Sequence, residues 1–151
     1  MKKKVLSFAM MLVLALVPMS IFAFNGSGTS SSPYLIQNAD DWNNFAADVA
    51  NGNTYSGVYF KLTSDIAVTT WAGNASNPFS GIFDGNNKTI TVNYTATGDK
   101  CAPFVRTRNV EIRNLKVTGD IATAYMQAAG FVAYVDASSA SHLQLRQRCD
   151  H

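Results

Sequence analysis

The spacing of apolar side chains near the start of the chain is that of a helix. Apolar residues recur at intervals of three and four positions, at Trp42, Phe45, Ala46 and Val49. This spacing gathers them on one stripe, and it predicts a single amphipathic helix over about residues 38–51. Asn38 is suited to cap the first turn, and Asp41 stands three positions further on, in a capping-box arrangement.

From Gly57 onward the apolar period shortens to two, which is typical of strands. Val58, Phe60 and Leu62 alternate with more polar neighbours. Further short strands are predicted at 66–68, 82–83, 89–94, 110–117 and 131–135. Turn-forming clusters such as Asp84-Gly85-Asn86-Asn87 separate them. Short strands that recur at fairly even intervals indicate either the stacked coils of a solenoid or a small antiparallel β-sandwich or barrel. Spacing alone does not separate these two mainly-β folds.

Residues 1–23 have the layout of a secretory signal peptide. Three lysines precede an apolar run from Val5 to Val17, and Pro18 ends any helix there. The following residues, up to Ala23, are suited to cleavage. An uncleaved anchor is the alternative, because residues 5–24 are long enough to span a bilayer. The signal predicts an extracellular or cell-surface location. Residues 24–32, which are rich in Gly, Ser and Thr, are predicted to be a flexible linker.

Charge and cysteine content narrow the functional classes. Three of the twelve basic residues lie in the signal, and the remaining nine face ten acidic ones. The near-neutral exported chain therefore predicts no binding to nucleic acid and none to a membrane after cleavage. Cys101 and Cys149 could form one disulfide in an exported protein, but their spacing does not establish it. Together with His142 and His151 they match no familiar metal-ligand spacing, so no metal or cofactor site is predicted.

Several segments, taken in order, resemble a known group of proteins. They are PYLI (33–36), ADDW (39–42), YSG (55–57), FKLTSDI (60–66), NPFSGIFDGN (77–86) and TITV (89–92). The series resembles the N-terminal region of large secreted bacterial surface proteins built on a right-handed parallel β-helix. AGFVA (129–133) is similar to a degenerate GLUG-type repeat of such proteins. The resemblance implies a helical cap and the first coils over 33–137, a surface location, and an adhesive or binding role. It implies no catalytic residues.

The charged residues leave an enzymatic alternative. A polysaccharide-active β-helix, lyase-like or hydrolase-like, needs carboxylates and basic groups clustered on one face. The candidates are Asp65, Asp84, Asp99, Asp120, Arg106, Arg108 and Arg113. The carboxylates stand in turn-forming contexts, where Asp is favoured for backbone geometry. No nucleophile elbow or phosphate loop is present in the sequence. The sequence therefore favours a non-enzymatic module.

Aromatic residues supply the candidate binding site. Side chains that could stack on sugar rings, if they share one exposed face, are Tyr55, Tyr59, Trp71 and Tyr94. Other aromatic residues are predicted to lie in the core: Trp42, Phe45, Phe60, Phe79 and Phe83. The expected partner is a surface glycan or another host or cell-wall component.

The last residues, 138–151, differ from the rest of the chain. They lack Gly and β-branched residues, and they carry both histidines. We interpret them as an irregular, non-native tail from a truncated or out-of-frame gene, which would make the chain a fragment or a non-functional product. A basic tail that binds an acidic glycan and an ordinary terminus are the alternatives.

Overall fold

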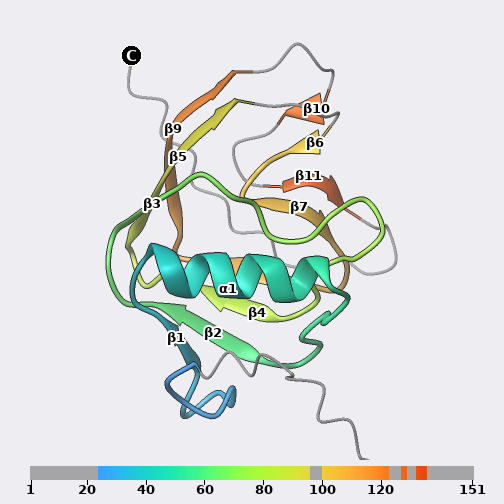
Figure 1. Cartoon of the computed structure of the whole chain (residues 1–151). Coiled ribbons are helices and arrows are strands. Elements are labelled where there is room, and N and C mark those ends of the chain that lie inside the picture. Colours follow the sequence, from blue (N-terminus) through green and yellow to red (C-terminus); the bar gives the residue numbers. More distant parts are fainter. Residues whose placement is uncertain (1–23, 96–99, 123–126, 129–131, 136–151) are drawn as a thin grey trace, which may run out of the picture.

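The structure is a computed structural model that describes residues 24–95, 100–122, 127–128 and 132–135. Several predictions fall partly or wholly outside these residues: the signal over 1–23, Asp99, the GLUG-like stretch, the pairing of Cys101 with Cys149, and the tail over 138–151. Within the described residues, the fold is mainly β, with strands in parallel sheets and one helix (Figure 1).

The elements follow one another in a regular order. They are β1 (Tyr34–Ile36), α1 (Ala39–Ala50), β2 (Tyr59–Leu62), β3 (Ile66–Val68), β4 (Ile82–Asp84), β5 (Thr89–Thr95), β6 (Lys100–Cys101), β7 (Phe104–Thr107), β8 (Glu111–Arg113), β9 (Lys116–Ala122), β10 (Gln127–Ala128) and β11 (Val132–Val135). The strand predicted over 110–117 is divided into β8 and β9 by a turn at Asn114, whose φ is 52°. Strands β6, β7 and β10, and the short β1, are not among the strands predicted above.

The strands pair side by side and in the same direction. Two sheets have the orders β1-β2-β4-β8 and β3-β5-β9, and β6 and β7 pair with β10 and β11. Every pairing between the described strands is parallel. The antiparallel β-sandwich is therefore not the arrangement of these residues, because its neighbouring strands run in opposite directions.

Helix α1 begins and ends where the sequence predicted. Asn38 accepts a hydrogen bond from the Asp41 N–H at 2.9 Å, and an Asp41 carboxylate oxygen accepts one from the Gln37 N–H at 2.8 Å. Side chains thus satisfy donors on both sides of the helix N-terminus. All four residues of the apolar stripe are buried, so the predicted amphipathic helix is confirmed.

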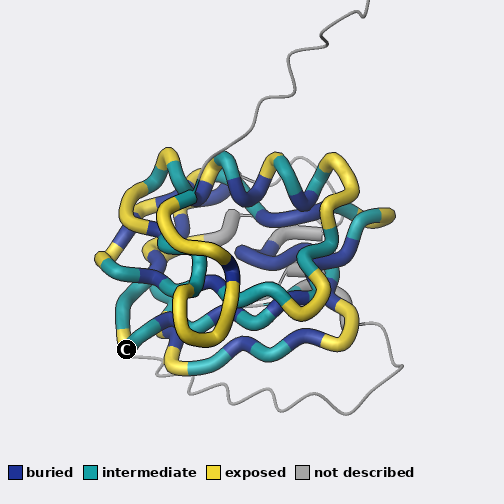
Figure 2. The backbone as a smooth tube through the Cα atoms, turned by 90° about the horizontal axis from the view of Figure 1, so that it is seen from below, coloured by how far each residue is buried: buried dark blue, intermediate teal, exposed yellow. Residues whose placement is uncertain are grey.

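The core is an aromatic cluster between α1 and the strands. Its largest fully buried side chains include the five aromatic residues predicted for it, together with Phe104. Phe45 lies at the centre, with its ring centroid 4.8 Å from that of Phe60 and 5.2 Å from that of Phe79. Trp42 packs edge-on against Phe83 and Phe104. In Figure 2, exposed residues gather at the bends of the chain and buried stretches lie within.

Residues 24–32, predicted to be a flexible linker, fold against β1 and β2. The Leu35 N–H donates to the Asn25 carbonyl at 2.9 Å, and the Tyr59 N–H donates to the Gly28 carbonyl at 2.9 Å. Gly28 is buried at a φ of 73°, and a Cβ there would lie 2.7 Å from the Tyr34 ring. The glycines that suggested flexibility therefore allow tight packing of this segment instead.

Candidate functional site

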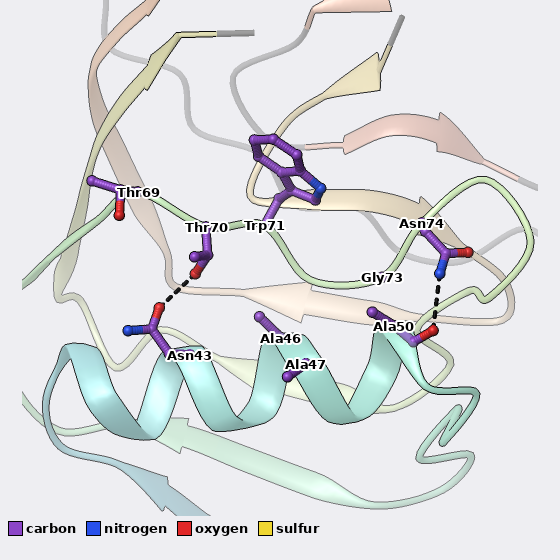
Figure 3. Close-up of a pocket in the computed structure, with 9 residues that line it drawn as sticks. All are labelled: Asn43, Ala46, Ala47, Ala50, Thr69, Thr70, Trp71, Gly73 and Asn74. Atoms are coloured by element: carbon purple, nitrogen blue, oxygen red, sulfur yellow. Dashed lines mark hydrogen bonds between the residues drawn. The ribbon is translucent and has the colours of Figure 1, made fainter. Parts of the chain in front are cut away.

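A shallow groove of about 350 Å³ lies between α1 and the segment that follows β3 (Figure 3). Its lining residues are Asn43, Ala46, Ala47, Ala50, Thr69, Thr70, Trp71, Gly73 and Asn74. The groove exists because three helical residues next to this segment, Ala46, Ala47 and Ala50, carry only methyl groups. Its polar groups belong to two asparagines and two threonines at the margins. Such a mixture of apolar floor and polar rim is typical of small-ligand sites.

Hydrogen bonds hold the segment 69–74 to the helix at both ends. The Thr70 hydroxyl donates to Asn43 Oδ1 at 2.6 Å, near the start of the helix. At the other end, Asn74 Nδ2 donates to the Ala50 carbonyl at 2.9 Å, and Asn77 Nδ2 donates to the same oxygen at 2.6 Å. These bonds also satisfy a carbonyl of the last helical turn, which has no partner within the helix.

Trp71 is the aromatic residue at this groove. Its side chain is half-buried, and its indole packs edge-on against Tyr94 with the ring centroids 5.6 Å apart. The Tyr94 hydroxyl and Trp42 Nε1 both donate to the Thr70 carbonyl, at 2.5 and 3.0 Å. In Figure 3 the indole lies on the side of the segment away from the helix, so it forms an edge of the groove and not its floor. The hydrogen bonds to the Thr70 carbonyl thus fix the backbone next to Trp71, and the buried ring of Tyr94 supports its indole.

The other three predicted stacking residues lie elsewhere. Tyr94 is only 2% exposed and serves as support for Trp71. Tyr55 packs edge-on against Phe60, and its hydroxyl donates to the Asp48 carboxylate. Burial, followed by this bond, raises the pKa of Tyr55 above its ordinary value. Tyr59 is half-buried on β2, in the sheet β1-β2-β4-β8, whereas Tyr94 lies on β5 in the sheet β3-β5-β9. The four side chains therefore do not form one exposed platform.

The candidate carboxylate Asp84 is engaged in a turn. It accepts from the Asn86 N–H at 2.8 Å, from Asn114 Nδ2 at 3.1 Å and from Arg113 Nε at 3.1 Å. Burial alone would raise the pKa of Asp84, but these bonds outweigh it, so the pKa lies below its ordinary value. The same contact with Asp84 is the main cause that raises the pKa of Arg113, which also bonds Glu111 at 2.7 Å. This group stabilises neighbouring turns.

The remaining charged candidates also lie apart from the groove. Asp65 accepts a hydrogen bond from the Thr89 N–H at 2.7 Å and so ties β5 to the bend before β3. Asp120 is exposed on β9, Arg106 donates to the Ala75 carbonyl, and Arg108 is exposed. Within the described part of the chain, no three His, Cys, Asp or Glu side chains gather closely enough to hold a metal ion.

Sequence reasoning singled out Trp71 but missed the groove beside it. The groove depends on Ala46, which belongs to the helical stripe, on Ala47 and Ala50 beside that stripe, and on the segment that follows β3. These three alanines were the available signal in the sequence. Whether they line a groove depends on which segment packs against the helix there, and local spacing does not determine that segment.

Comparison with known proteins gives a similarity to a bacterial protein. The chain is 34% identical over 120 residues to a protein of Evansella cellulosilytica described as "Putative Gly-rich membrane protein". The match covers 69% of this chain and 13% of the relative, so the chain spans a small part of the relative's length. No family model matches the chain, and no solved structure matches it significantly. Among the residues that the structure describes, no helix is both long and apolar enough to cross a bilayer.

Proposed function

We propose that this chain is the helix-capped start of a right-handed parallel β-helix, of the kind found in GLUG-type surface proteins of bacteria. In this proposal it is an exported, non-enzymatic module that binds glycan at the cell surface. The observation that carries the proposal is the forward stacking of parallel strands, in which each strand pairs with the strand at the same place in the next turn of the chain.

The strand register supports this stacking. Phe60 pairs with Phe83, and Phe83 pairs in turn with Ile112. On the second sheet Ile90 lies between Ile66 and Val117. Apolar residues thus stack on apolar residues in both sheets. The number of residues between one strand and the strand that it pairs with is similar from pair to pair. A nearly constant advance from one coil to the next is the defining regularity of solenoids.

The helix fits the role of a cap. A solenoid must cover the apolar interior of its first coil, because no earlier coil packs against it. Helix α1 places Trp42 and Phe45 over the aromatic core, and it presents Asn43 and Ala47 outward. The relative from Evansella cellulosilytica is described as a membrane protein. That description accords with a location in the cell envelope and is said of that protein alone.

Glycan binding is the activity that the groove supports best. Trp71 offers an aromatic ring held by Tyr94, and Asn43 and Thr69 offer polar groups within the same groove. Sugar rings present apolar C–H faces and a rim of hydroxyls, which match an indole beside amide and hydroxyl groups. Asp84 is engaged in a turn, Asp65 bonds the Thr89 N–H, and both lie apart from the groove, so they do not favour the polysaccharide-active alternative.

Binding to immobilised cell-wall and exopolysaccharides, measured with the purified full chain, tests this proposal. We expect retention without release of reducing ends or unsaturated products. Trp71→Ala should weaken binding by about tenfold, since aromatic contacts contribute roughly 0.5–1.5 kcal/mol each. Tyr59→Ala, which removes an aromatic side chain from the other sheet, is the matched control and should bind as the unaltered chain does. Equal loss in both variants, or product release, would contradict the proposal.

The surface location has its own test. A tagged copy, expressed with residues 1–23 in a bacterial host, should be digested by protease added to intact cells. A second copy that lacks these residues should be protected inside the cell. Protection of both copies would count against an exported module.

A further inference from the structure

The end of the groove nearest the start of α1 holds a hydrogen-bond donor that is open to a ligand. The Thr70 hydroxyl donates to Asn43 Oδ1 at 2.6 Å, and this bond sets the orientation of the amide. Asn43 is exposed, and its Nδ2 has no hydrogen-bond partner among the residues that the structure describes. In Figure 3 this nitrogen points away from the alanines, toward the start of the helix. It therefore offers two N–H groups to a ligand.

A carboxylate lies next to this donor on the helix surface. Asp40 stands three positions before Asn43 in α1, and side chains at that spacing are neighbours, with Cβ atoms about 5–6 Å apart. Asp40 is exposed, and within the described part of the chain its carboxylate takes part in no hydrogen bond or ion pair. Thr69, also exposed, brings its hydroxyl from the segment on the other side of the groove. A strong acceptor, an N–H donor and a hydroxyl thus border one end of the groove.

This set of groups matches the hydroxyls of a sugar. A hydroxyl both donates and accepts, so one sugar hydroxyl can donate to the Asp40 carboxylate while its neighbour accepts from Asn43 Nδ2. Hydrogen bonds to an ionised group are about twice as strong as those between neutral groups. The methyl groups of Ala46 and Ala47 lie farther along the groove, where an apolar C–H face of the same chain can cover them.

The charges around the groove disfavour an acidic sugar. Helix α1 carries Asp40, Asp41 and Asp48 and no basic residue, and the residues that line the groove are all uncharged. Arg106 donates to the Ala75 carbonyl, just beyond the opposite end of the groove. The carboxylate of a uronic acid bound beside Asp40 would therefore face a like charge and lose water without gaining a cationic partner.

We infer that the groove selects neutral glycans over acidic ones, and that Asp40 and Asn43 determine this selection. Asp40 accepts from the hydroxyls of a neutral sugar and repels a uronate, and Asn43 donates to an adjacent hydroxyl. The inference rests on the glycan binding proposed above, and it names the class of glycan that the site takes.

Titration calorimetry of the full chain with soluble tetrasaccharides tests the selection. The neutral probes are built from glucose, mannose or N-acetylglucosamine, and the acidic probe is built from galacturonate. At low salt the best neutral probe should bind about tenfold more tightly than the acidic one. Added salt should strengthen the binding of galacturonate, because it screens the repulsion from Asp40, and should leave the neutral probe unchanged. Equal or tighter binding of galacturonate, or no binding of any neutral probe, would overturn the inference.

Variants of Asp40 assign the selection to this residue. Asp40→Asn should weaken the neutral probe by about tenfold, because it removes a charged acceptor. Asp40→Lys should reverse the preference toward galacturonate, a gain that a misfolded chain could not produce. Asp120→Asn, which removes an exposed carboxylate from β9, is the matched control and should bind as the unaltered chain does.

The inference and the proposed function can fail separately. An unchanged preference in Asp40→Lys, or equal loss in Asp40→Asn and Asp120→Asn, would overturn the role of Asp40. Retention on immobilised polysaccharide, and its loss in Trp71→Ala, would in that case still support a glycan-binding module. Loss of all retention would overturn both.

Discussion

The carbonyl of Thr70 is the point at which the groove is anchored to the core, and removing its two donors tests that anchoring. Trp42 Nε1 and the Tyr94 hydroxyl both donate to this oxygen, at 3.0 and 2.5 Å. Tyr94→Phe removes the hydroxyl alone, and Trp42→Phe removes the indole N–H together with part of the ring. After either change the carbonyl retains one donor. After both changes it retains neither of them.

The expected free energies follow from this difference. A single lost hydrogen bond costs about 1 kcal/mol, whereas a buried acceptor without any partner costs about 1–3 kcal/mol. Trp42→Phe also loses ring volume in a side chain that is 0% exposed, so its own cost is larger. That volume loss occurs in the single and in the double variant alike, so it cancels in a double-mutant cycle. We therefore expect the double variant to lose roughly 1 kcal/mol more than the sum of the singles.

Urea unfolding of the four proteins, followed by far-ultraviolet circular dichroism, measures this coupling. Circular dichroism is preferred because Trp42→Phe removes a fluorescent indole. Costs that add to within about 0.5 kcal/mol would refute the reasoning, because they would mean that the Thr70 carbonyl does not depend on these two donors together. Coupling without loss of glycan retention would separate the anchoring of the segment from its proposed role in binding.

Three further predictions concern the packing, a turn and the helix cap of the first coils. Gly28→Ala and Gly57→Ala both place a side chain at a φ of 73°, but a Cβ at Gly57 meets nothing within 4 Å. Urea unfolding should show that Gly57→Ala costs about 1–2 kcal/mol and that Gly28→Ala costs about 1–3 kcal/mol more. Equal costs would mean that residues 24–32 are not packed. Asp84→Asn should cost about 1 kcal/mol, because the hydrogen bonds of Asp84 favour its charged form. The pKa of Asp84 is lowered in the folded protein, so this stabilisation is complete above the ordinary pKa of about 4 and is lost as the pH falls through the folded pKa. The stabilities of the two proteins should therefore converge in acid. Asn38→Ala removes the helix cap and should cost about 1 kcal/mol, whereas Asn38→Asp should cost much less, as thermal unfolding of both variants would show.

The features that the sequence predicted best are those with short-range causes. The helix, its cap at Asn38 and its buried stripe all depend on residues close to one another in the chain. The turn at Asp84 is equally local, since its carboxylate bonds the N–H of Asn86 two residues on. Strand alternation around Phe60 likewise needed no knowledge of the partner strand.

The features that it could not predict depend on distant contacts. Tyr94 stands in a polar stretch of sequence that is typical of an exposed aromatic residue. It is nevertheless buried, and its hydroxyl donates to the carbonyl of Thr70, which lies 24 residues earlier in the chain. Residues 24–32 have the composition of a flexible linker, but Gly28 fits between Tyr34 and Val58 and bonds Tyr59. In both cases composition indicates exposure, and a long-range partner determines burial.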